Sequence, residues 1–184
     1  CDEVWFLLEA LLAGVVPVLL PPNLPPAKLA SLKHAYGRFA ERTDQQIICP
    51  ADAVTADPRL FAVLLTSGST GAPKLVGASE SALRIGVTTI HQVQALEPVA
   101  AAAVLLPLHF GFALINQLLW AIHYEREVIL TSGMGLPAQA LKELRDAGAA
   151  MVCMVSQQIR TLFSLGLAAA APLSNLQVVN LAGG

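Results

Sequence analysis

Apolar helical stretches alternate along the chain with short apolar runs of β type. The predicted strands are 15–20, 47–49, 60–65, 74–78, 102–106, 128–130, 150–154 and 176–181. The predicted helices are 3–13, 27–41, 81–93, 112–123, 136–147 and 157–165. Strands that alternate with helices of this length indicate βαβ units. The predicted fold class is therefore α/β, with mainly parallel β-sheets layered with helices.

The most apolar stretch, residues 4–20, raises the question of a membrane span. Glu9 lies inside it and Pro17 near its end, while Asp2 and Glu3 precede it. A spanning helix needs about 20 apolar residues with basic flanks, and a signal peptide needs a basic start. We therefore expect a buried helix followed by a buried strand, and no membrane span.

Composition narrows the class of protein. The chain has 184 residues, of which 55% are hydrophobic and 13% are charged, so we expect a packed core rather than disorder. Eleven basic and thirteen acidic residues give a net charge of -2. This balance disfavours a nucleic-acid partner, because no basic surplus neutralises the phosphates. The cysteines Cys1, Cys49 and Cys153 lack metal-ligand spacing, which favours a reducing, cytoplasmic location.

A polar, glycine-rich segment follows the predicted strand 60–65 and reads TSGSTGAPK from Thr66 to Lys74. Backbone amides of such a loop form anion-binding nests, and the glycines let a ligand approach the backbone. Short hydroxyl side chains add hydrogen-bond donors, and Lys74 adds a positive charge. These features together suit a polyphosphate. The residues predicted to bind it are Thr66, Ser67, Gly68, Ser69, Thr70, Gly71 and Lys74.

Two other motifs are excluded at this segment. A Walker A loop places Lys directly after its second glycine, whereas two residues separate Gly71 from Lys74. A nucleophile elbow requires Gly-x-Ser-x-Gly, but Ser67 stands two residues before Ser69. Composition alone leaves open the alternative that the segment is a flexible polar turn between two strands.

The order of these residues resembles the phosphate-loop signature of the adenylate-forming superfamily, which includes acyl-CoA synthetases, aryl-CoA ligases, luciferases and peptide-synthetase adenylation domains. Segments 7–21, 106–112, 152–165 and 173–184 are similar to further motifs of that family, in the same order. The resemblance thus covers nearly the whole chain. The chain departs from the usual family pattern at Leu75, Glu80, Ala113 and Ser156, which suggests a divergent member.

The resemblance implies an enzyme that uses ATP and Mg²⁺ to activate a carboxylic acid as an acyl-adenylate. The acyl group then passes to a thiol, either of coenzyme A or of carrier-protein pantetheine. Residues 66–70 would bind the β- and γ-phosphates, and Lys74 would assist catalysis electrostatically. The implied substrate-pocket residues are His109, Phe110, Gly183 and Gly184. The residues alone also allow His109 and Phe110 to be a helix start packed against the core.

The same resemblance predicts that residues 1–184 are a partial N-terminal domain, with no C-terminal domain. Residues 1–58 would form a preceding βα segment, and 59–184 would carry the phosphate loop and acyl pocket. The family motif that binds Mg²⁺ lies beyond Gly184, so no metal ligand is predicted. We expect the isolated chain to be inactive and to self-associate through apolar surface. The alternatives are a noncatalytic nucleotide- or partner-binding module that retains the loop, and an α/β domain whose loop binds nothing.

The other candidate groups point to structural roles. His34, His91 and His123 stand alone on predicted helices, which favours surface or capping positions. Cys153 lies in an apolar run without an activating neighbour, so a buried strand position is expected. The sequence does not predict which acid is the substrate.

Overall fold

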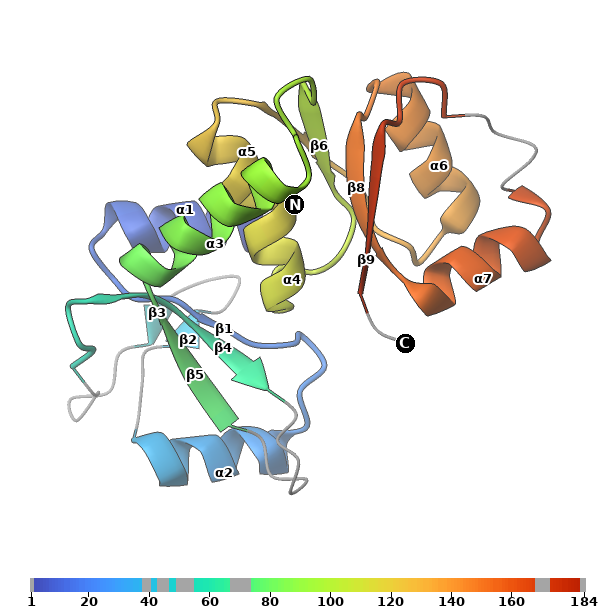
Figure 1. Ribbon diagram of the computed structural model, residues 1–184. Coiled ribbons are helices and arrows are strands. Elements are labelled where there is room, and N and C mark those ends of the chain that lie inside the picture. Colours follow the sequence, from blue (N-terminus) through green and yellow to red (C-terminus); the bar gives the residue numbers. More distant parts are fainter. Residues whose placement is uncertain are drawn as a thin grey trace. The chain divides into compact units, whose positions relative to one another are not determined.

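The computed structural model describes residues 2–37, 41–42, 47–48, 55–66, 74–167 and 173–182 (Figure 1). The chain divides into two compact units. The larger unit comprises Cys1–Glu9 and Ser81–Gly184, and the smaller unit comprises Ala10–Glu80.

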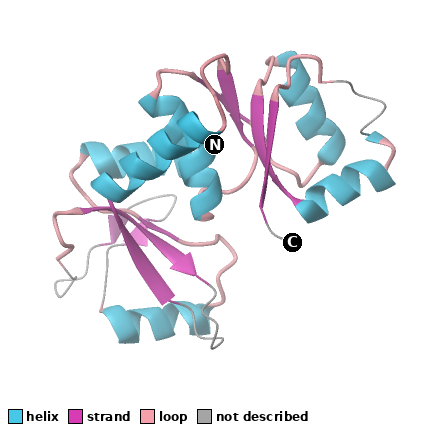
Figure 2. Cartoon of the chain, viewed as in Figure 1, coloured by secondary structure: helices cyan, strands magenta, loops and turns pink. Residues whose placement is uncertain are grey.

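The larger unit is built on a four-stranded sheet in which every strand pairs in parallel (Figure 2). Its strands are β6 (Ala101–Val104), β7 (Glu127–Leu130), β8 (Met151–Val155) and β9 (Val178–Ala182), in the order β7-β6-β8-β9. Parallel strands covered on both faces read as continuous apolar runs, and β6 and β8 do so. The α/β class and the parallel sheet predicted from the sequence are confirmed for this unit.

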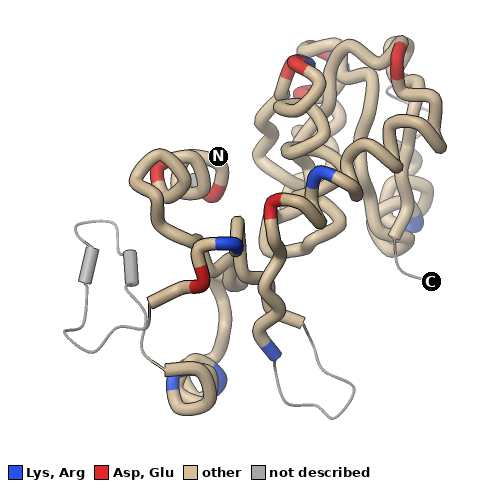
Figure 3. Tube along the Cα trace, turned by 60° about the vertical axis from the view of Figure 1, so that its left-hand side comes forward, with Lys and Arg blue, Asp and Glu red and all other residues tan. Residues whose placement is uncertain are grey.

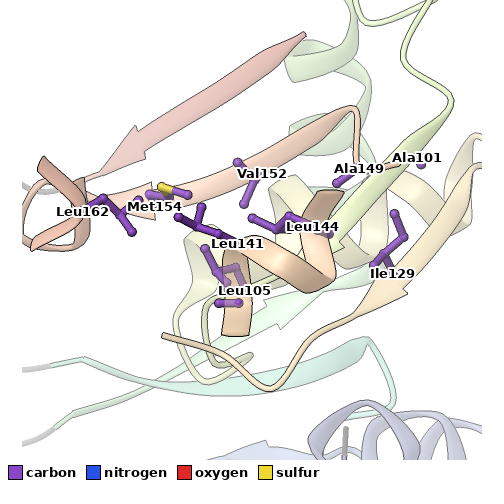
Figure 4. Close-up of a cluster of buried hydrophobic side chains, with 11 residues drawn as sticks. Ala101, Leu105, Ile129, Leu141, Leu144, Ala149, Val152, Met154 and Leu162 are labelled. Carbon is purple, nitrogen blue, oxygen red and sulfur yellow. The ribbon is translucent and has the colours of Figure 1, made fainter. Parts of the chain in front are cut away.

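One face of this sheet is covered by α6 (Pro137–Asp146) and α7 (Ser156–Ser164). Leu141 and Leu144 of α6 pack with alternate residues of the central strands (Figure 4). The strand and helix α7 residues of this cluster include Ala101, Ala103, Ile129, Val152, Met154 and Leu162. Gly148 closes the segment after α6 with a positive φ of 69°, as its position in the sequence predicts.

The intervening strand residues face the other way, because successive side chains of a strand point to opposite faces. Ala102 and Met151 pack there against Val87 of α3 (Glu80–Val93) and against Trp120. The result is a three-layer unit with helices on both faces of a parallel sheet.

The segment predicted as a plain helix over 112–123 contains a wide turn. It runs as α4 (Gly111–Ala113), a π-helix η1 (Leu114–Leu119) and α5 (Trp120–His123). The Trp120 amide donates to the carbonyl of Ile115, five residues back. Both Asn116 and Gln117 are buried in this turn. The Asn116 side-chain amide donates a hydrogen bond to the Phe112 backbone carbonyl at 2.8 Å. The Gln117 side-chain amide donates to the Cys153 backbone carbonyl at 3.3 Å.

His91 occupies a buried aromatic cluster of the larger unit. Its Nδ1 accepts a hydrogen bond from Trp120 Nε1 at 3.3 Å, and its ring stacks on Tyr124 with centroids 3.7 Å apart. The predicted surface or capping role is therefore wrong for His91, because the apolar pattern did not show that this face of α3 packs on an indole. His34 and His123 are exposed, as predicted.

The smaller unit contains β1 (Val18–Leu19), β4 (Leu60–Thr66) and β5 (Lys74–Ser79), in the order β1-β4-β5. β1 is parallel to β4, whereas β5 is antiparallel to it. The further strands β2 (Glu41–Arg42) and β3 (Ile47–Ile48) form an antiparallel pair. The expectation of mainly parallel pairing therefore does not extend to this unit.

Two predicted element boundaries in this part of the chain are wrong. The strand predicted over 15–20 pairs only at Val18–Leu19, and Val15 is exposed. The helix predicted over 27–41 is α2 (Pro26–Tyr36), and it ends where Gly37 adopts a positive φ of 85°. The preceding helix α1 (Asp2–Leu12) ends before Gly14, as predicted.

The turn between β7 and α6 is held by a carboxylate. Glu143 Oε2 accepts hydrogen bonds from the Ser132 backbone N–H at 2.8 Å and from its hydroxyl at 3.0 Å. Gln139 donates to the other oxygen at 3.0 Å. The Ser132 backbone hydrogen bond, followed by that from Gln139, lowers the pKa of Glu143 below its usual value.

This shift predicts a pH-dependent loss of stability in Glu143→Gln. We expect the free energy of unfolding to fall by about 1 kcal/mol at neutral pH, because hydrogen bonds to a half-exposed carboxylate are partly screened. The stabilisation is fully present above the ordinary glutamate pKa of about 4.3, and it is lost as pH falls through the lowered pKa of the folded state. Urea unfolding of both proteins at several pH values measures this difference in the free energy of unfolding.

Glu127 of β7 is exposed, so Glu127→Gln is a matched control. An equal effect of the two substitutions would contradict the stabilising role of the Glu143 carboxylate.

Candidate active site

The hairpin formed by β4 and β5 carries the two described ends of the predicted phosphate-binding segment. Thr66 ends β4 and Lys74 begins β5, and the two are cross-strand partners. The Thr66 hydroxyl donates to the Lys74 carbonyl at 3.3 Å. Thr66 and Lys74, which flank segment 67–73 in the sequence, therefore lie side by side. The predicted residues that lie outside the described part of the chain are Ser67, Gly68, Ser69, Thr70 and Gly71.

A second hydrogen bond fixes the backbone on the other side of Lys74. The Leu75 amide donates to the Tyr36 hydroxyl, at the end of α2, at 3.3 Å. The Lys74 residue is itself exposed. The exposed lysine therefore extends from a backbone that is held by hydrogen bonds at Lys74 and Leu75. Sequence reasoning missed Tyr36, because nothing marks a single tyrosine 39 positions away as a partner of β5.

The larger unit places His109 and Phe110 after the carboxyl end of β6. The chain passes from β6 to β7 on one side of β6, and then returns to β8 on its other side. The strand order therefore reverses between β6 and β8. In open α/β sheets, ligands bind outside the carboxyl ends of the strands at such a point. The fold thus gives the segment around His109 the position of a ligand-binding loop.

His109 and Phe110 differ in their surroundings. The His109 side chain is 12% exposed, and its Nδ1 lies 3.7 Å from Glu3 Oε1. The Phe110 ring lies 4.4 Å from the imidazole, centroid to centroid, and the residue is half exposed. Glu3, in the first turn of α1, is a contact that sequence reasoning missed. The predicted pocket residues Gly183 and Gly184 lie outside the described residues, directly after β9.

Cys153 of β8 is not a candidate nucleophile. The residue is fully buried, and burial raises the pKa of its thiol to about 12. It therefore stays protonated at neutral pH, and a thiol in this state does not attack substrates. The predicted buried strand position is confirmed.

Charged side chains are few in the described part of the chain, and Figure 3 shows them scattered along the trace. Within the described ranges, no group of three or more His, Cys, Asp or Glu residues is placed to hold a metal ion. None of the helices that these residues form is both long enough and apolar enough to cross a membrane.

The layered α/β fold and the β4–β5 hairpin agree with a match to a known family. The sequence model of the family described as AMP-binding enzyme matches residues 30–184. The chain therefore belongs to the AMP-binding enzyme family, and the resemblance seen in its motifs is confirmed. No curated protein matches the chain.

Solved structures of adenylate-forming enzymes share this fold. O-succinylbenzoate coenzyme A synthetase from Bacillus subtilis, in complex with AMP, is 18% identical with a TM-score of 0.78, over 100% of this chain and 53% of that one. VinN in complex with L-aspartate is 22% identical with a TM-score of 0.73, over 100% of this chain and 54% of that one. An adenylation domain of a keto acid-selecting peptide synthetase module, bound to keto acyl adenylate, is 16% identical with a TM-score of 0.74. It matches 97% of this chain and 39% of that one. The chain spans about half the length of the first two.

Proposed function

We propose that the chain is part of an AMP-forming ligase that activates a carboxylic acid as its acyl-adenylate and passes the acyl group to a thiol. The observation that carries the proposal is the hairpin base, where Thr66 and Lys74 are paired across β4 and β5. They flank a segment of glycines and hydroxyl side chains in a chain that belongs to the AMP-binding enzyme family. The structures bound to AMP and to a keto acyl adenylate support this reading.

The donor set at the hairpin fits a triphosphate. Hydroxyl and backbone donors together with one exposed ammonium group suit an anion with several oxygens, and ATP supplies the adenylyl group of the reaction. We propose that Thr66 and residues 67–71 bind the β- and γ-phosphates. Binding through the Thr66 hydroxyl requires it to turn from the Lys74 carbonyl. Mg²⁺ would accompany the nucleotide, and we assign it no ligand in this chain.

Lys74 would stabilise the transition state in which the substrate carboxylate attacks the α-phosphate. The substrate carboxylate and the α-phosphate repel each other, so a positive charge placed where they approach lowers the barrier to attack. The backbone of Lys74 is fixed by Thr66 on one side and through Leu75 by Tyr36 on the other. This anchoring would keep the ammonium group near the phosphates without ordering the whole lysine side chain in advance.

We propose that His109, Phe110, Gly183 and Gly184 line the acyl pocket. Support comes from the position of His109 after β6, at the point where the strand order reverses. The acceptor would be coenzyme A or a carrier protein, and the location cytoplasmic. In the same proposal, residues 1–184 are a partial N-terminal domain, with 1–58 as the preceding segment and 59–184 as the part that carries the site. Exposed apolar side chains such as Phe163 and Leu165 would promote self-association of the isolated chain.

Carboxylate-dependent exchange between ATP and pyrophosphate tests this function. We expect exchange in a longer protein that contains these residues, assayed against a panel of carboxylic acids, and negligible exchange by the 184-residue chain alone. Steady exchange by the purified chain would refute the partial-domain proposal. ATP binding by the longer protein without exchange for any acid would instead favour a noncatalytic nucleotide-binding module.

A further inference from the structure

We propose that Glu3 is a positioning residue that places the proton of the His109 imidazole on Nδ1 and leaves Nε2 for a bound substrate. The contact between Glu3 and His109 stands on the geometry of the larger unit. Only the assignment of His109 to the substrate pocket rests on the proposed function. Nothing in the sequence near either residue points to the other, because they are separated by more than a hundred positions.

The carboxylate of Glu3 is held in place by the residue that precedes His109. Its Oε2 accepts a hydrogen bond from the Leu108 backbone N–H at 2.7 Å, a short distance for a charge-assisted bond. Its Oε1 lies 3.7 Å from His109 Nδ1. One oxygen therefore fixes the carboxylate on the backbone, and the other is left directed at the imidazole.

The surroundings of His109 Nδ1 decide which ring nitrogen carries the proton. Nδ1 is buried and has no hydrogen-bond partner in the described part of the chain. An ionised carboxylate only accepts hydrogen bonds, so a lone pair on Nδ1 would face the negative charge of Glu3. A proton on Nδ1 makes the same contact attractive. The separation of 3.7 Å is long for a hydrogen bond, but contacts of this kind commonly tighten when a substrate binds.

The consequence for chemistry concerns the opposite nitrogen. In a neutral imidazole with its proton on Nδ1, Nε2 has a lone pair and accepts a hydrogen bond or a proton. Phe110 restrains the ring further, since its centroid lies 4.4 Å from that of the imidazole at an interplanar angle of 37°. Glu3 and Phe110 thus fix the tautomer and the orientation of His109, at the carboxyl end of β6.

Nitrogen-15 NMR of the labelled 184-residue chain tests the tautomer directly. At about pH 9, well above the ordinary histidine pKa, long-range proton–nitrogen spectra show which ring nitrogen is protonated. We expect His109 to be protonated at Nδ1, and its signal is identified by its absence in His109→Gln. In Glu3→Gln we expect His109 to lose its preference for protonation at Nδ1. In Glu3→Asp we expect part of that preference to remain. The control on the same helix is Glu9→Gln, which should leave the spectrum of His109 unchanged.

Two results would overturn the proposal. One is protonation of His109 at Nε2 in the unsubstituted chain, a measurement that stands even where Glu3→Gln fails to fold. The other is an unchanged tautomer in a folded Glu3→Gln chain, with folding confirmed by the backbone amide spectrum.

Kinetics then separate this proposal from the proposed function. In a longer active protein, we expect Glu3→Gln to lower kcat about tenfold with the KM for ATP unchanged, as for the loss of a group that orients a histidine. A tautomer that depends on Glu3 in a protein without exchange activity would refute the function and leave the positioning intact. Full exchange activity together with a His109 tautomer that is unchanged in Glu3→Gln would refute only the positioning role of Glu3.

Discussion

Lys74→Ala is expected to slow adenylate formation about 10²–10³-fold, the usual cost of removing one group that stabilises charge in a transition state. The lysine is exposed, and its backbone is fixed by hydrogen bonds on both sides. In the proposed mechanism, its loss would remove positive charge where the carboxylate and the α-phosphate meet, while the β4–β5 pairing would remain. The rate of carboxylate-dependent pyrophosphate exchange, measured in a longer protein that contains this segment, gives the effect.

A matched control separates this local role from a general change of charge. Lys28 is exposed on α2 of the same unit, so Lys28→Ala removes the same charge away from the hairpin. We expect that control to retain the full exchange rate. Lys74→Arg should fall between the two, because the guanidinium keeps the charge but not the compact ammonium geometry. Equal rates for Lys74→Ala and the control would remove Lys74 from the mechanism.

The second large effect is expected at the centre of the larger unit, where Trp120→Ala should lower the free energy of unfolding by about 3–5 kcal/mol. Trp120 is fully buried between the sheet and α3, and its indole N–H bonds to His91. Folded domains are stable by only about 5–15 kcal/mol, so much of the stability would be lost. Denaturant unfolding followed by circular dichroism measures it.

The chain supplies its own control for the tryptophan experiment. Trp5 on α1 is 58% exposed, so Trp5→Ala should change the free energy of unfolding by about 0.5 kcal/mol or less. Trp120→Phe should give an intermediate loss, because it retains an aromatic ring but no N–H for His91. Equal losses for the two alanine substitutions would show that the cluster around Trp120 does not stabilise the unit as described.

The elements of the parallel sheet could be predicted because strands that are buried on both faces appear in the sequence as continuous apolar runs. The strand predicted over 150–154 is β8 (Met151–Val155), and the helix predicted over 81–93 is α3 (Glu80–Val93). Pairing could not be predicted in the same way. β1 pairs with β4 only at Val18 and Leu19, although its apolar run is longer, and the apolar pattern of β5 does not distinguish antiparallel from parallel pairing.

The candidate site likewise contains a part that could be predicted from the sequence and a part that could not. The chemistry of the segment that we propose to bind phosphates is local, since glycines, hydroxyls and Lys74 follow one another in the sequence. The partners that position these groups are not local. Tyr36 reaches the start of β5 from α2, and Glu3 reaches the segment after β6 from α1. Such contacts join single residues far apart in the chain and leave no periodic signal, so only the structure reveals them.

The wide turn η1 makes the length of its helix adjustable. Each hydrogen-bonded ring of a π-helix spans one residue more than that of an α-helix, so the turn holds an extra residue between the same two ends. A chain one residue shorter between Leu114 and Leu119 could close an ordinary α-helix there and still keep Ala113 and Trp120 in place. The buried pair Asn116 and Gln117 lies inside this turn. Loss of one residue in this segment is therefore expected to disturb the packing of Ala113 and Trp120 less than it would in a regular α-helix.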